Sequence, residues 1–148
     1  VYEVITGLVK KYGVDTRNLR LELTETAVVN ENENMEVIRK LHDAGFIIEI
    51  DDFGSGYSSL NMLKDVCSDV LKIDREFLRE TENAVRSRDI LEEIIRLSNR
   101  MNMTVITEGV ETKEQVEMLT DMGCRVFQGF YFSKPISIQE FEDKYKVV

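Results

Sequence analysis

The chain has 148 residues, 43% of them hydrophobic, which is enough for one domain with a substantial core. Asp and Glu outnumber Lys and Arg by 28 to 19, and this acidic balance argues against binding to a nucleic acid duplex. An anionic substrate would therefore need a bridging cation, for which a divalent metal is the simplest candidate.

Five short apolar runs alternate with helical patterns along the chain. The first helix is expected to end at Gly13 and the second at Gly45, and capping boxes begin the last two helices at Thr112 and Ser137. The runs are nearly continuous, as is typical of strands in a parallel sheet. The expected strands are 19–23, 46–50, 70–73, 104–107 and 125–132. This alternation predicts an α/β fold, either an open doubly wound sheet or part of a (β/α)8 barrel.

Each expected strand carries one polar side chain near its C-terminal end. Residues two apart on a strand share a face, so these side chains point away from the apolar positions beside them. Parallel α/β folds build their sites at the carboxyl ends of the strands. The polar residues concerned are Glu22, Asp51, Lys72, Glu108 and Gln128.

The carboxylates of this set, with Asp52 just beyond its strand, would repel one another unless cations neutralised them. Oxygen ligands without a histidine or cysteine cluster favour Mg²⁺ or Mn²⁺ over zinc. Adjacent aspartates suit two ions, which at a separation of about 3.5–4 Å can clamp a phosphoryl displacement. Lys72 would orient an attacking water or stabilise charge on the phosphate.

Each of these residues also has a simpler interpretation. Glu22 alone could be an ion-paired strand residue, the two aspartates could be turn residues, and Lys72 could be a surface lysine. The glycine-rich stretch 53–59 lacks the third glycine of the dinucleotide fingerprint and the lysine of the P-loop. We interpret it as a loop that bends close to the metal site.

Arg20 and Glu49 precede Glu22 and Asp51 by two residues on neighbouring strands. Because they share the inward face with the site residues, we predict that they form an ion pair beneath the site.

Five motifs in this order resemble those of the EAL family of cyclic di-GMP phosphodiesterases. They are "ELTE" (22–25), "DDFGSGYSSL" (51–60), "KID" (72–74), "EGVE" (108–111) and "QGFYFSKP" (128–135). The resemblance implies a (β/α)8 TIM barrel and metal-dependent hydrolysis of cyclic di-GMP to linear pGpG. It also implies two bound ions, Mg²⁺ or Mn²⁺.

By position, the resemblance implies that Glu22 and Asp51 bind the first metal. Asp51 would bridge to a second metal, which Asp52 and Glu108 also bind. Lys72 resembles the lysine that positions the nucleophilic water, and Gln128 resembles a glutamine that lines the substrate site together with Asp51.

Glu25 resembles the glutamate that steadies the glycine loop, and with Lys72 and Glu108 it completes the implied catalytic set. In the family this loop links dimerisation to activity. Its residues here are Phe53, Gly54, Ser55, Gly56, Tyr57, Ser58 and Ser59.

The chain departs from the family pattern in two ways. The Glu-Ala-Leu segment and a later metal-binding asparagine of the family lie on strands that precede those present here. We therefore expect residues 1–148 to be the C-terminal portion of a single EAL domain, about its last five βα units, and to be inactive or nearly so alone. Glu49 stands where the family usually has a small or apolar residue.

The expected partners are cyclic di-GMP, a second copy in a homodimer, and upstream sensory or diguanylate cyclase domains. Cys67 and Cys124 form no C-x-x-C motif, and no stretch resembles a signal peptide or membrane span. We expect a cytoplasmic location without membrane contact by this segment, although a longer parent protein could be membrane-anchored.

Two alternatives remain open at this point. One is a non-catalytic module that binds cyclic di-GMP or a protein through a degenerate EAL barrel. The other is a phosphoacceptor receiver domain, which also combines five parallel strands, paired acidic residues and a lysine. A receiver has its acidic pair on the first strand and its lysine on the last, whereas Lys72 lies on the strand directly after the aspartates.

Overall fold

Five parallel strands form a single sheet in which the spatial order is the chain order. The computed structural model describes residues 1–24, 32–54, 60–79 and 83–146. The strands are β1 (Arg20–Thr24), β2 (Ile47–Phe53), β3 (Val70–Ile73), β4 (Thr104–Thr107) and β5 (Val126–Phe127). A doubly wound sheet, including that of a receiver domain, reverses its strand order at a switch point. The sequential order excludes an open doubly wound sheet and a receiver domain, and it agrees with consecutive strands of a (β/α)8 barrel.

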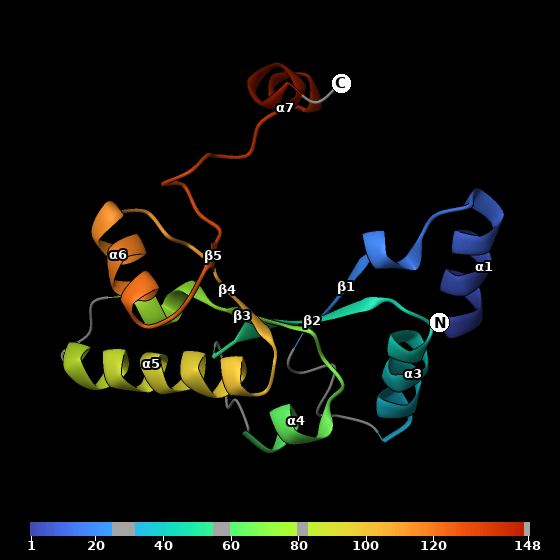
Figure 1. The fold of residues 1–148 in the computed structure, drawn as a ribbon, viewed down its shortest axis with the longest axis horizontal. Coiled ribbons are helices and arrows are strands. Elements are labelled where there is room, and N and C mark those ends of the chain that lie inside the picture. Colours follow the sequence, from blue (N-terminus) through green and yellow to red (C-terminus); the bar gives the residue numbers. More distant parts are fainter. Residues whose placement is uncertain (25–31, 55–59, 80–82, 147–148) are drawn as a thin grey trace.

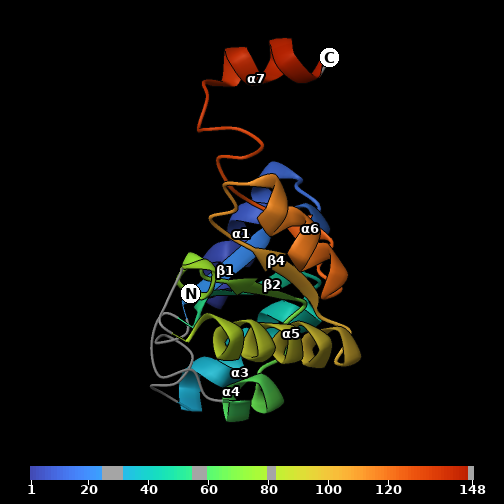
Figure 2. The same cartoon turned by 90° about the vertical axis from the view of Figure 1, so that its left-hand side faces the viewer.

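The helices alternate with the strands, as the sequence predicts. They are α1 (Tyr2–Tyr12), α3 (Asn32–Asp43), α4 (Leu60–Asp65), α5 (Ala84–Arg100), α6 (Lys113–Asp121) and α7 (Ile138–Tyr145), with short 3₁₀ helices η1 (Thr16–Asn18) and η2 (Arg75–Leu78). Helices α3, α4 and α5 lie on one side of the sheet, while α7 stands away from it (Figures 1 and 2). Both expected capping boxes are present, at Thr112 with Gln115 and at Ser137 with Glu140. No helix in the described ranges is both long and apolar enough to span a membrane.

Alternation along the strands separates an apolar face from a polar one. Ile48 and Ile50 of β2 are fully buried in the core, whereas Glu49 between them lies on the opposite face of the sheet. The same core contains Leu71, Ile73, Leu91, Ile95, Val105 and Leu119. The helices thus cover one face, and the other face is left for polar side chains.

The last strand is shorter than the sequence predicts. The expectation of a strand over 125–132 is wrong beyond Phe127, where the ladder to β4 ends. From there the chain turns around Val110, whose backbone N–H donates to Gln128 O at 3.1 Å and whose carbonyl accepts from Tyr131 N at 3.1 Å. A Cβ at Gly129 would overlap the backbone of Val110, so the two segments approach closely because residue 129 is glycine.

The expected ion pair between Arg20 and Glu49 is confirmed. Arg20 Nη1 lies 2.6 Å from Glu49 Oε1, and the side-chain exposures are 55% and 3%. Glu49 lies in register with Glu22 on β1 and with Val70 on β3. Arg20 therefore neutralises a carboxylate that is buried close to the other acidic side chains of this face.

Replacing Arg20 tests whether this pair stabilises the sheet. Arg20→Ala leaves the Glu49 carboxylate buried without its cation, so we expect the free energy of unfolding to fall by about 1–3 kcal/mol, less than for a fully buried pair because Arg20 is half exposed. Urea unfolding measures the change. Arg17→Ala, which removes an exposed pair with Asp15, is the matched control and should change stability little.

Candidate active site

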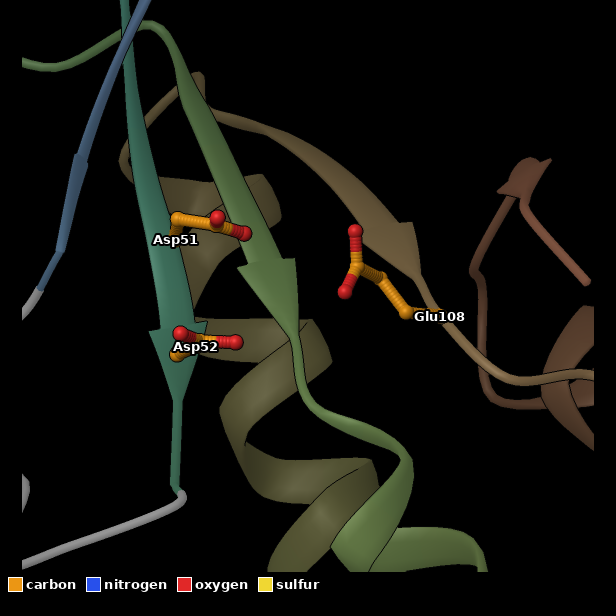
Figure 3. A group of neighbouring side chains, drawn as sticks. All are labelled: Asp51, Asp52 and Glu108. Carbon is orange, nitrogen blue, oxygen red and sulfur yellow. The ribbon is translucent and has the colours of Figure 1, made fainter.

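Three carboxylates meet at the C-terminal ends of β2 and β4. Asp51 and Asp52 belong to β2, and Glu108 directly follows β4. One oxygen from each side chain lies within 4.8 Å of the others, and all three residues are partly buried. Figure 3 shows the two aspartates pointing from β2 toward Glu108.

A β-bulge explains how adjacent aspartates serve one site. Ile50 pairs with Leu71 and Phe53 pairs with Ile73, so three steps along β2 match two steps along β3. In a regular strand Asp51 and Asp52 would point to opposite faces, but the extra residue cancels that alternation. Asp52 has a φ of 56°, which is uncommon for a residue other than glycine. Asp52 therefore lies inside an irregular β2, not just beyond the strand as the sequence suggested.

Lys72 lies at the centre of the acidic cluster. Its Nζ is 2.8 Å from Asp51 Oδ1, 2.9 Å from Glu108 Oε1 and 3.0 Å from Glu22 Oε1. Only 8% of its side chain is exposed. One ammonium on β3 thus joins carboxylates from β1, from β2 and from the segment after β4.

These contacts determine the protonation of Lys72. Burial alone would lower the pKa of the ammonium, but its close contacts with the carboxylates of Asp51, Glu108 and Glu22 outweigh burial and hold the pKa above its usual range. Lys72 is therefore a cation at neutral pH. It can donate hydrogen bonds, but it cannot accept a proton.

The cluster fits a divalent metal. It offers only carboxylate oxygens, which suit a hard cation, and the single ammonium of Lys72 contacts three carboxylates while Asp52 lies beside Asp51 and Glu108. Asp51 Oδ1 is buried, and no donor among the described residues makes a hydrogen bond of normal geometry to it, although Lys72 Nζ is close. This oxygen is available to a cation that approaches from another direction.

Gln128 lies beside the cluster in a cleft of about 560 Å³ that Glu108 also lines. It directly follows β5, and its backbone N–H donates to Thr107 O at 2.9 Å. The cleft also contains Arg75, Lys134 and Phe130, which the sequence reasoning missed. Strand periodicity gives no signal for them, because Arg75 lies in η2 and the other two lie in the turns after β5.

The remaining expected site residues lie only partly within the described ranges. Phe53 ends β2 and is buried in the core, and Gly54 directly follows it. Glu25 and the loop residues Ser55, Gly56, Tyr57, Ser58 and Ser59 lie outside the described residues.

Comparison with known proteins identifies the family. The EAL domain family model matches residues 2–135, which is most of the chain. The chain belongs to the EAL family.

Relatives of this EAL chain include much longer proteins. It is 36% identical over 137 residues to the oxygen sensor protein DosP of Escherichia coli, covering 92% of the chain and 17% of DosP. It is 36% identical over 126 residues to the cyclic di-GMP phosphodiesterase NbdA of Pseudomonas aeruginosa, covering 84% of the chain and 16% of NbdA. The chain therefore spans about a sixth of these curated relatives.

Solved EAL structures share the fold. The PaMucR phosphodiesterase, solved in complex with c-di-GMP, matches with a TM-score of 0.84 and 33% identity over 93% of this chain and 56% of its own. BlrP1 of Klebsiella pneumoniae, solved with manganese and cyclic di-GMP, matches with a TM-score of 0.81 and 33% identity over 90% of this chain and 35% of its own. The expectation of an incomplete TIM-barrel-type EAL fold is confirmed.

The raised pKa of Lys72 predicts how stability of the metal-free EAL chain depends on pH. The folded state holds the Lys72 proton more tightly than the unfolded state, whose pKa has the ordinary value of 10.5. The stabilisation by this ammonium is therefore fully present below pH 10.5 and is lost as pH rises through the raised pKa. Urea unfolding in the presence of a chelator should show that Lys72→Met is less stable than the unsubstituted chain at neutral pH. The difference in the free energy of unfolding should shrink above pH 10.5. A difference that grows in this range would contradict the assignment.

Proposed function

We propose that residues 1–148 are the C-terminal portion of an EAL domain that hydrolyses one phosphodiester bond of cyclic di-GMP to give pGpG. The observation that carries this proposal is the cluster of Asp51, Asp52 and Glu108, two of which contact the ammonium of Lys72. NbdA and PaMucR, both phosphodiesterases, support the substrate class.

Asp51, Asp52, Glu108 and Glu22 are the residues that would hold two divalent ions, Mg²⁺ or Mn²⁺. Such ions supply Lewis-acid stabilisation of charge on the phosphoryl group. The manganese in the BlrP1 structure supports this choice of cofactor. The bulge contributes by turning Asp52 to the same side of the sheet as Asp51, so that both aspartates would hold the ions.

Lys72 has a role that follows from its charge. With ions held by the carboxylates, Lys72 would share its partner oxygens and would have N–H groups for other acceptors. Lys72 can then donate hydrogen bonds to an attacking water or to a phosphoryl oxygen, where it stabilises developing negative charge. We assign Lys72 the role of a hydrogen-bond donor, and we propose that a carboxylate of the cluster accepts the proton of the attacking water.

The cleft beside the cluster suits a cyclic dinucleotide. Arg75 and Lys134 supply cationic groups for phosphate, Gln128 supplies an amide, and Phe130 supplies an aromatic face for a base. These residues give the acidic chain a local surface that an anionic ligand can approach.

The proposal extends to the assembly around the chain. We place these residues in a cytoplasmic, homodimeric protein with upstream sensory or diguanylate cyclase domains. DosP, an oxygen sensor, gives support for a sensory partner domain. We also propose that the isolated chain has little or no activity, because it matches only 64% of the crystallised EAL domain of Mycobacterium smegmatis DcpA.

The first test concerns the metal-binding carboxylates in the full-length protein. Asp52→Asn removes one charged oxygen ligand, and we expect the turnover of cyclic di-GMP to fall by about 10²-fold or more, as is usual when a metal-clamped transition state loses stabilisation. Chromatography of pGpG formed with Mn²⁺ measures this.

Asp121→Asn, on the exposed surface of α6, is the matched control and should leave turnover unchanged. An unsubstituted protein that binds cyclic di-GMP without turnover would support the non-catalytic alternative instead.

The second test concerns the isolated chain. The first-metal ligand Glu22 lies on strand β1, half exposed at 54%, so we expect weak retention of the ion and turnover near the background rate. The same chromatographic assay with Mg²⁺ or Mn²⁺ measures it. Turnover by residues 1–148 at the rate of the full-length protein would refute the proposed inactivity.

A further inference from the structure

The short helix η2 contacts both of the glycines that follow the candidate metal ligands. It comes directly after β3, which lies between β2 and β4 in the sheet. Gly54 follows Asp51 and Asp52 on one side, and Gly109 follows Glu108 on the other. A Cβ at Gly54 would overlap the ring of Phe77, and a Cβ at Gly109 would overlap the Cβ of Arg75.

Hydrogen bonds hold η2 at this position. The Asp74 side chain accepts from Glu76 N at 2.7 Å and begins the helix. The Asp74 backbone N–H donates to Phe53 O at 3.1 Å, and Glu108 N donates to Ile73 O at 3.0 Å. The end of β3 is thus tied to β2 and to the segment after β4, with η2 directly beyond.

Asp52 has a backbone conformation that needs support from its surroundings. Its φ of 56° is costly for a residue with a Cβ, and such a conformation persists only where neighbouring structure enforces it. Gly54, two residues later, has a φ of 99° and lies against the Phe77 ring. The ring therefore restricts the path of the chain immediately after the bulge.

We propose that η2 is a wedge that sets the separation between Asp51 and Asp52 on one side and Glu108 on the other. Its two points of contact are the ring of Phe77, which lies against Gly54, and the Cβ of Arg75, which lies against Gly109. Phe77 is then a positioning residue for the metal site. This inference rests on the proposed function, because the ions that the carboxylates hold are part of that function.

Manganese binding by the full-length protein tests the wedge. We expect Phe77→Ala to weaken Mn²⁺ binding by about 10–100-fold, the loss that is typical when a group supporting metal ligands is removed. Phe77→Leu keeps part of the contact and should cause a smaller loss. Electron paramagnetic resonance of free Mn²⁺ measures the affinity, and urea unfolding of each variant measures its stability. If Phe77→Ala does not fold, the Mn²⁺ affinity of Phe77→Leu is compared with that of the unsubstituted protein instead.

Leu78→Ala is the matched control, because Leu78 belongs to the same short helix and is also partly buried against the core. It should reduce stability while leaving Mn²⁺ affinity little changed. If it weakens Mn²⁺ binding as much as the Phe77 variants do, η2 acts only through general packing and the inference is overturned.

Failure of the proposed function gives a different result. If the unsubstituted full-length protein binds no Mn²⁺, the metal site itself is wrong, and a crystal structure of a Phe77 variant decides the present inference. Oxygens of Asp51, Asp52 and Glu108 that remain within 4.8 Å of one another would overturn it. Carboxylates that move apart would support it.

Discussion

The contact of one ammonium with three carboxylates is the interaction on which the site depends. Lys72 extends from the central strand of the sheet and contacts Glu22, Asp51 and Glu108 at 2.8 to 3.0 Å. Without it, these acidic groups at neighbouring strand ends would repel one another in a partly desolvated region. The same contact explains why Lys72 stays protonated in the metal-free chain, and the proposed ions would use the same carboxylate oxygens. Stability of the metal-free chain and the chemistry of the metal-bound site therefore depend on one side chain.

The β-bulge gives this arrangement its second metal-facing aspartate. A regular strand can present only every other residue to a site, so two ligands on one strand are normally two residues apart. The extra residue in β2 allows Asp51 and Asp52 to share a face, at the expense of a positive φ at Asp52. Adjacent carboxylates are closer together than alternate ones, which suits ions that share a ligand. The irregular backbone of β2 thus positions both aspartates for the proposed metal site.

Much of this architecture follows from periodicity in the sequence. The alternation of strands and helices, the inward parity of Glu22, Asp51 and Lys72, and the Arg20–Glu49 pair all depend on regular repeats, which side-chain patterns report directly. The bulge, the early end of β5 and the contacts of η2 could not be predicted in this way. They depend on where the backbone leaves a regular ladder and on close approach to Gly54, Gly109 and Gly129, which carry no side-chain pattern.

Strand β1 contains both Arg20 and Glu22, and within the described part of the chain it is hydrogen-bonded to β2 alone. An edge strand opens at a lower free energy than the strands it borders, so its amides should exchange with solvent before those of β3. Each opening event withdraws the cation from Glu49 and one carboxylate from Lys72 in the same motion. The buried Glu49 carboxylate then loses its cation, while Lys72 loses one of its three carboxylate partners. Local opening of this single strand is therefore coupled to the electrostatics of the whole acidic cluster. The rate at which β1 opens sets an upper limit on how long all the ion pairs of the cluster persist together.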